Sequence, residues 1–197
     1  VASAKLRGAQ QRIERFRPYA DKFYEILGLA DKAGPLPHPL LEVRKEIKAT
    51  GIVLVTADRG LCGGFNAHLI STALKLAAAK ASEGKAVKFY CVGKKGRNAA
   101  KKTPHELVSE YADQMNNFDF TLGATVGMEV ISAYEEGAVD EVFLIYGDFV
   151  SLAKQPPTTL TILPVTSREK EGEEGAAEEK SGPASVYEYE PDVEELL

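Results

Sequence analysis

The feature that most constrains the fold is a run of apolar, mostly β-branched residues at 51–57, GIVLVTA. Such a run has no polar face, so both of its faces must be covered, as in a parallel sheet with helices on each side. A glycine-rich turn follows directly, and residues 66–80 have helical periodicity. One face of that helix carries Leu69, Ala73, Leu76 and Ala77. The segment therefore predicts a buried strand, a tight turn and a helix.

The same alternation continues through the middle of the chain. Further strands are predicted at 86–93, 105–111, 141–149 and 152–164, the last of them at an edge of the sheet. A short basic helix or loop is predicted at 94–102 and a helix at 122–134. Alternating strands and helices indicate an α/β domain over residues 51–167, with a mostly parallel, Rossmann-like sheet and flanking helices.

The N-terminal segment has a different pattern, an apolar heptad repeat within residues 1–32. Its candidate seam is Leu6, Ile13, Phe16, Phe23 and Leu27. A two-position seam over four repeats is typical of a coiled-coil helix, and no second heptad helix exists in the chain, so the partner helix is missing. The alternative is that the helix packs on the domain's own sheet. Pro18 lies on the outward face, where a kink disturbs the seam least.

Two segments are predicted to be irregular. Residues 33–50 open with AGPLPHPL and form a predicted hinge. Residues 168–185 are acidic, rich in glycine and poor in large apolar groups, which predicts a flexible loop. Residues 186–197 return to order, and the D-x-x-E spacing of Asp192 and Glu195 begins a further helix. A helix starting where the chain stops, and a first helix without its partner, suggest a truncated protein.

The glycine-rich turn after the first strand is the strongest local signal for a binding site. Gly60, Gly63 and Gly64 permit backbone conformations closed to other residues, and a helix N-terminus after such a turn can bind phosphate. The turn is not G-x-G-x-x-G, however, and no lysine follows it as in a P-loop. The second predicted strand ends in Cys91-Val92-Gly93 without the acid that a ribose site uses. A nucleotide-binding enzyme using loop 59–66 is the alternative to a structural turn.

Other candidates for chemistry are sparse. Cys62 and Cys91 are not in metal-ligand spacing, and both are expected to be buried free thiols, with a nucleophilic Cys62 as the weaker alternative. The three histidines are scattered, and Asp58 with Arg59 is expected to form a surface ion pair at most. No catalytic residue, cofactor or metal site is predicted.

Basic residues cluster between Gly84 and Lys102, a stretch that contains no acid. They are Lys85, Lys88, Lys94, Lys95, Arg97, Lys101 and Lys102. The cluster is either a solvated face or a patch toward acidic proteins, lipid headgroups or the acidic segment after Arg168. Nucleic acid is not an expected partner, because interleaved aromatic residues are lacking.

Several blocks, in order along nearly the whole chain, resemble gamma subunits of the rotary ATP synthase. They are VASAKLRGAQQRIERFRPYADKF (1–23), VTADRGLCGGFNAHLI (55–70), VGKKGRNAAKK (92–102), GDFVSLAKQPPTTLTILPV (147–165) and YEYEPDVEELL (187–197). The second is similar to the family's T-S-D-R-G-L-C-G-G-[FL]-N block. The family's earlier N-terminal residues and long C-terminal helix are absent, as is the regulatory cysteine pair of chloroplast enzymes.

The resemblance implies a non-catalytic rotor subunit of the central stalk, which transmits torque between the membrane c-ring and the catalytic hexamer. Its partners would be the alpha, beta and epsilon subunits and the c-ring, without direct membrane insertion, at the cytoplasmic face of a bacterial inner membrane. The beta-subunit contact loop would be Asp58, Arg59, Gly60, Leu61, Cys62, Gly63 and Gly64. The residues facing the c-ring and epsilon would be Tyr187, Tyr189 and Glu190.

Overall fold

The computed structural model describes residues 2–33, 38–115, 120–151 and 153–165, and within the first helix it describes side chains from residue 6 to residue 22. Residues Pro39–Val165 form one compact unit, and helix α1 (Ala2–Ala33) belongs to a separate one. The predicted acidic loop at 168–185, the return segment at 186–197 and the candidates Tyr187, Tyr189 and Glu190 lie outside the described residues.

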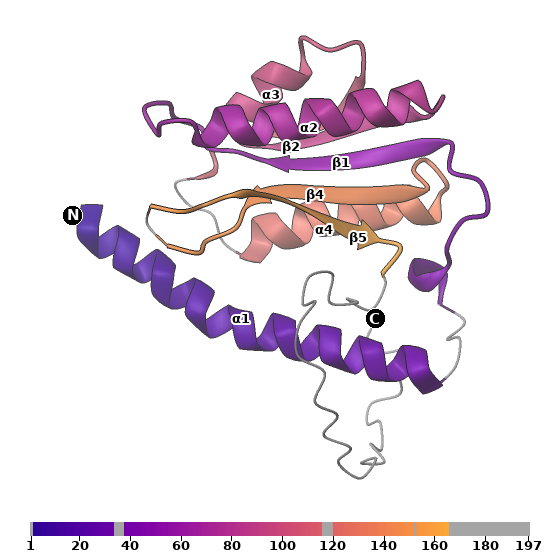
Figure 1. The fold of residues 1–197 in the computed structure, drawn as a ribbon, viewed down its shortest axis with the longest axis horizontal. Coiled ribbons are helices and arrows are strands. Elements are labelled where there is room, and N and C mark those ends of the chain that lie inside the picture. The colour runs from indigo at the N-terminus through magenta and orange to yellow at the C-terminus, as the bar shows by residue number, and fades with distance from the viewer. Residues whose placement is uncertain (1, 34–37, 116–119, 152, 166–197) are drawn as a thin grey trace, which may run out of the picture. The chain divides into compact units, whose positions relative to one another are not determined.

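A five-stranded sheet forms the centre of the compact unit (Figure 1). Its strands are β1 (Ala49–Val55), β2 (Ala86–Val92), β3 (Glu106–Tyr111), β4 (Glu141–Gly147) and β5 (Pro157–Leu163), in the order β3-β2-β1-β4-β5. The first four run parallel, and β5 pairs with β4 in the antiparallel direction at one edge. The mostly parallel sheet and its edge strand are thus confirmed.

Helices cover both faces of the sheet (Figure 1). Helices α2 (Phe65–Ser82) and α3 (Lys94–Ala100) lie on one face, and α4 (Phe120–Glu135) lies on the other, beside the short 3-10 helix η1 (Pro39–Leu41). β1 begins at Ala49, two residues earlier than predicted and inside the predicted hinge, because Ala49 and Thr50 already pair with Ala86 and Val87 of β2.

The central strand divides its side chains between two apolar cores. Ile52 and Leu54 pack with Leu69, Ala73 and Ala77 of α2, as the periodicity of that helix predicts. Val53 packs toward the opposite core, which Leu122, Val126, Val130 and Tyr134 of α4 complete. Burial of β1 on both faces explains why its sequence is a continuous apolar run.

Helix α1 has 32 residues and contains Pro18. The seam residues whose side chains are described are all exposed: Leu6 by 42%, Ile13 by 38% and Phe16 by 59%. The predicted long helix is present. Its pairing with a second helix stays a prediction. Among the described residues, no helix has the length and apolar character needed to cross a membrane.

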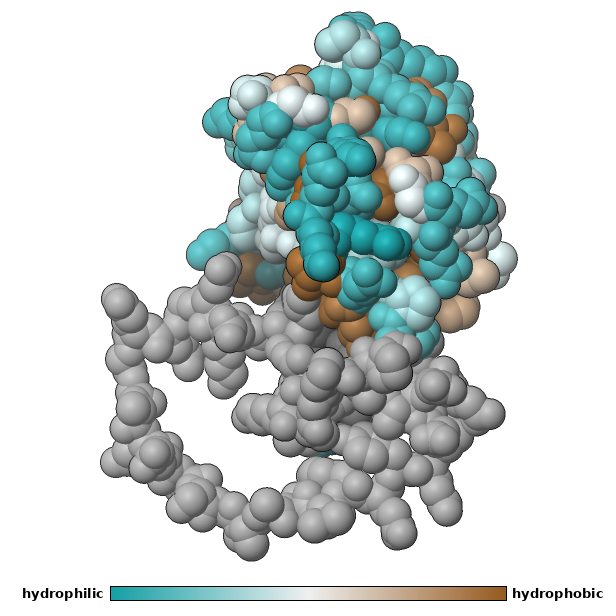
Figure 2. Space-filling model, turned by 90° about the vertical axis from the view of Figure 1, so that its right-hand side faces the viewer, coloured by the Kyte–Doolittle hydropathy of each residue, from teal (hydrophilic) through white to brown (hydrophobic). Residues whose placement is uncertain are grey.

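The side of the molecule where β1 begins and α2 ends is mainly hydrophilic over its described surface (Figure 2). Glu141, at the start of β4, lies 2.7 Å from the Lys80 amine and 3.7 Å from the Lys85 amine. Lys85 also lies 2.7 Å from Glu83. Local carboxylates therefore neutralise the first of the clustered basic residues.

Candidate functional site

The glycine-rich turn lies at the carboxyl end of β1, where residues 59–64 are all exposed. Two of its residues have left-handed backbone conformations, Leu61 with φ 60° and Gly63 with φ 58°. Gly64 has φ −76°, so of the turn's glycines only Gly63 adopts the conformation that favours glycine. The strained residue is Leu61, whose side chain is fully exposed at the tip of the turn.

Asn66, in the first turn of α2, stabilises the glycine-rich turn through side-chain hydrogen bonds. Its side chain is 92% buried, and its amide oxygen accepts a hydrogen bond of 2.9 Å from the backbone N–H of Ala57. Its amide nitrogen donates to the carbonyl of Arg59 at 3.2 Å and to the sulfur of Cys62 at 3.0 Å. One buried polar side chain thus fixes the loop at three points.

Asp58 connects the carboxyl ends of three neighbouring strands. Its carboxylate accepts backbone N–H bonds from Lys94 after β2 (2.9 Å), and from Asp113 (2.9 Å) and Met115 (3.0 Å) after β3. Burial alone raises the pKa of Asp58, but these three bonds and the nearby Lys94 charge outweigh it, so the pKa lies below its ordinary value. The expected ion pair with Arg59 is wrong, because the carboxylate is directed at backbone amides instead.

Helix α3 approaches β1 closely at the same end of the sheet. The Thr56 hydroxyl accepts a 2.8 Å hydrogen bond from the N–H of Gly96. Gly93 has φ 94°, and a Cβ atom there would overlap the carbonyl of Thr56. Glycine at position 93 is therefore required both by its conformation and by the space available.

The clustered basic residues are mostly paired with acids of β3 and its flanking segments. Lys88 lies 3.5 Å from Glu106, Lys94 lies 3.8 Å from Asp113, and Lys101 lies 2.6 Å from Glu110, which also pairs with Arg97. Of this cluster, only Lys95 and Lys102 have no ion pair within the described part of the chain. The charges of the cluster are therefore largely balanced by acids of the same compact unit.

The two thiols differ in environment. Cys91 is buried as expected, and burial together with the charge of Glu110 raises its pKa to about 12. Cys62 is exposed, so the expectation of a buried thiol is wrong there, because the turn projects its residues into solvent. No group of histidine, cysteine and acidic side chains suited to a metal ion occurs among the described residues.

A nucleotide site in this class of sheet lies where the strand order reverses, here between the carboxyl ends of β1 and β4. The ring of Phe65, the first residue of α2, lies against Gly147 at the end of β4, where an added Cβ would be only 2.5 Å from the ring. The imidazole of His68 lies over Gly64 in the same way. Side chains of the protein thus fill the crevice that a phosphate would enter.

Backbone N–H groups on the other side of β1, toward β2 and β3, are also occupied. Asp58 already takes the N–H of Lys94, at the start of α3, and the two N–H groups after β3. Sequence reasoning did not identify Asp58, Asn66 and Phe65 as the residues that close this site. The only local signal is a polar Asn66 on the apolar face of the α2 segment.

Comparison with known proteins identifies the family of the chain. A family model described as ATP synthase matches residues 1–197. The chain is 64% identical over 198 residues to the ATP synthase gamma chain of Nitratidesulfovibrio vulgaris strain Hildenborough, and 42% identical over 201 residues to that of Desulforapulum autotrophicum. The chain belongs to the ATP synthase gamma chain family. It is matched over its whole length, and it spans 66% and 67% of the length of these two relatives.

A solved structure from an ATP synthase has a similar fold. It is the central stalk and c-ring of the mitochondrial ATP synthase of Tetrahymena thermophila, which matches with a TM-score of 0.62 at 24% sequence identity. The match covers 83% of this chain and 69% of that one. The match shows that the two chains share the same α/β fold.

Proposed function

We propose that the chain is part of the central-stalk rotor of an ATP synthase, carrying torque between the c-ring and the catalytic hexamer of alpha and beta subunits. The observation that carries this proposal is the gamma-chain match over all 197 residues. It is supported by the filled crevice beside Phe65, which leaves the unit without the nucleotide site that an enzyme of this fold class would use. The nucleotide chemistry belongs to the other subunits of the complex.

Helix α1 supplies the shaft in this proposal. Its exposed seam residues Leu6, Ile13 and Phe16, with Phe23 and Leu27 further along the helix, pair with a second helix to form an antiparallel coiled coil. An isolated helix exposing such a stripe is poorly protected from association, whereas a paired helix buries it. The coiled coil enters the hexamer and forces the beta subunits through their states.

The loop from Asp58 to Gly64 is the proposed contact with a beta subunit. The Arg59 side chain is exposed and has no ion pair within the described residues, so its charge is available to an acidic partner. A contact that must break at each step has to be weak, and exposed ion pairs contribute about 0.2–1 kcal/mol. A hydrogen bond donated by Asn66 and the backbone N–H bonds accepted by Asp58 keep the loop in place between contacts.

The membrane-facing end of the rotor is assigned to residues near the C-terminus of the chain. Tyr187, Tyr189 and Glu190 face the c-ring and the epsilon subunit in this proposal, which rests on the family resemblance of their block. The complex is placed at the cytoplasmic face of a bacterial inner membrane, and this chain is peripheral to the membrane.

Direct observation of rotation tests the proposal. In a complex built from alpha, beta and a full gamma subunit carrying this sequence, a gold nanorod is attached through Lys75→Cys on the exposed face of α2. The background is Cys62→Ser, since Cys91 is buried and needs no replacement. With the beta subunits fixed to glass, ATP should turn the rod in one direction. A stationary rod on a complex that still hydrolyses ATP would show that the chain is not the rotor.

A further inference from the structure

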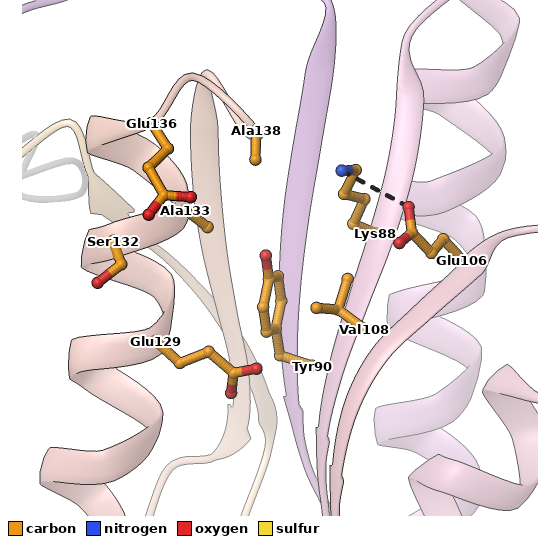
Figure 3. Close-up of a pocket in the computed structure, with 9 residues that line it drawn as sticks. All are labelled: Lys88, Tyr90, Glu106, Val108, Glu129, Ser132, Ala133, Glu136 and Ala138. Atoms are coloured by element: carbon orange, nitrogen blue, oxygen red, sulfur yellow. Dashed lines mark ion pairs between the residues drawn. The ribbon is translucent and has the colours of Figure 1, made fainter.

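A shallow groove of about 440 Å³ lies between α4 and the edge of the sheet formed by β2 and β3 (Figure 3). Helix α4 makes its closest contacts with β4 and η1, and the groove opens beside it toward β3. Val108 contributes aliphatic surface to the groove, Tyr90 contributes its hydroxyl, and Glu106, Glu129 and Glu136 contribute carboxylates. The groove is built from residues that the glycine-rich loop does not use.

Tyr90 is the unusual residue of this groove. Its side chain is 99% buried, yet its hydroxyl has no hydrogen-bond partner among the described residues and points into the groove (Figure 3). Burial, and then the charges of Glu129 and Glu106, raise the pKa of Tyr90 to about 12, so the phenol is neutral at physiological pH. The hydroxyl oxygen lies at the wall of the groove, where it can accept a hydrogen bond from a bound group.

The charges around the groove favour a cation. Three carboxylates line it against one amine, that of Lys88, which lies 3.5 Å from Glu106. Glu129 accepts a 2.8 Å hydrogen bond from the Tyr111 hydroxyl, which orients its carboxylate. Glu136 follows the last turn of α4, where the negative end of the helix dipole also attracts cations.

We propose that this groove receives a lysine or arginine side chain from a protein partner. The aliphatic stem of such a side chain packs on Val108 and Ala133, and its cationic head lies between Glu129 and Glu136. The Tyr90 oxygen accepts one of its N–H bonds. A long side chain with an apolar stem and a charged end matches the two kinds of surface that the groove offers. The groove is open on one side, so a side chain projecting from a folded surface can enter.

Binding of short capped peptides to the 197-residue chain tests the chemistry of the groove. In an NMR titration, acetyl-Ala-Arg-Ala-amide should shift the backbone amides of Ala133 and Ala138 in a saturable way, with a Kd on the order of 1 mM. The same peptide with neutral citrulline in place of arginine should bind at least about fivefold more weakly, because it lacks the charge. Equal shifts with both peptides would overturn the proposal.

Two variants locate the binding site, and a third variant serves as a control. Glu136→Gln and Tyr90→Phe should each raise the Kd of the arginine peptide about threefold to tenfold. Tyr90→Phe removes a hydroxyl that has no bond within the described residues, so the fold should tolerate it. Glu135→Gln makes the same charge change at a neighbouring exposed residue outside the groove and should bind as the unchanged protein does. Equal losses for Glu135→Gln and Glu136→Gln would show attraction to acidic surface in general and contradict the groove.

The partner is tested in the assembled complex by hydrogen exchange. The amides of residues 88–90 and 133–139 should exchange at least about tenfold more slowly in the intact ATP synthase than in the isolated chain. If the peptide binds but these amides are not protected in the complex, the groove binds cations but does not contact a protein partner there. The rotor proposal is tested separately by nanorod rotation, which does not depend on the groove.

Discussion

At the scale of single residues, Asp58 determines how the carboxyl ends of β1, β2 and β3 are held together. We expect Asp58→Asn to destabilise the protein by about 2 kcal/mol at pH 7, because an amide NH₂ cannot accept all three backbone N–H bonds. The lowered pKa of Asp58 means that its contribution is present above its unfolded pKa, near 4, and is lost as pH falls through the folded pKa.

Urea unfolding at several pH values measures this effect. The difference between the unchanged protein and Asp58→Asn should shrink below about pH 4, since protonation removes the same acceptor that the substitution removes. Asp21→Asn, at an exposed carboxyl of α1, is the matched control and should change little at either pH. A difference for Asp58→Asn that stays constant down to pH 2 would contradict the assignment.

The two left-handed residues of the turn should respond in opposite ways to substitution. Leu61→Gly should leave stability unchanged or raise it by up to about 1 kcal/mol, because it relieves the φ of 60° and its fully exposed side chain loses no packing. Gly63→Val should cost about 1–2 kcal/mol through the backbone alone, since no atom lies within 4 Å of an added Cβ.

Thermal melts of both variants, with Gly60→Ala as the control, measure this contrast. Position 60 is not left-handed, and its added Cβ would meet only the flexible end of Lys95, at 3.6 Å from the amine. A loss of stability in Leu61→Gly equal to that in Gly63→Val would show that Leu61 packs in the folded protein.

The two cysteines should react at very different rates. Iodoacetamide at pH 8 should modify Cys62 in the folded protein, because its sulfur is exposed. Cys91 should react only after unfolding, since it is buried and its pKa of about 12 leaves almost no thiolate. Mass spectrometry of a tryptic digest, with and without urea, distinguishes the two sites, and rapid labelling of Cys91 without urea would contradict the described core.

At the scale of elements, the sequence pattern predicted β1 to β4 and the three α-helices of the compact unit to within a few residues. It placed the start of β5 five residues too early and did not predict η1. Local signals suffice there, because the β1 run must be buried on both faces and the α2 segment has one apolar side. The site was less predictable. The partners of Asp58 are 36 to 57 residues away along the chain, and Phe65 meets Gly147 across the sheet. Such contacts depend on strand order, which periodicity does not encode.

The exposed seam of α1 gives a prediction about association of the 197-residue chain. Leu6, Ile13 and Phe16 form an apolar stripe, so the chain should self-associate through it at high concentration. Phe16→Glu should abolish this association in sedimentation velocity. Gln11→Glu adds the same charge on the outward side of the helix and should not affect it. Concentration-independent sedimentation of the unchanged protein as a monomer would contradict the exposed seam.

At the scale of the whole molecule, the fold combines the architecture of a nucleotide-binding domain with a closed binding crevice. Strand order and the glycine-rich turn place a loop and a helix N-terminus where phosphates bind in related sheets. In this chain Phe65 fills the space and Asp58 supplies an internal carboxylate for the nearby N–H groups. A unit closed in this way is suited to presenting a firm exposed loop rather than to holding a small ligand.

This closure predicts that the chain does not bind nucleotides. Calorimetry with ATP, ADP and NAD should show no site with a Kd below about 1 mM, where binding would contribute about 4 kcal/mol. Phe65→Ala removes the ring from Gly147, but the His68 imidazole still lies over Gly64, so this variant should also fail to bind while losing about 3 kcal/mol of stability. Submillimolar binding by the unchanged protein would restore the enzyme interpretation. Binding by Phe65→Ala alone would show instead that the Phe65 ring by itself keeps nucleotides out.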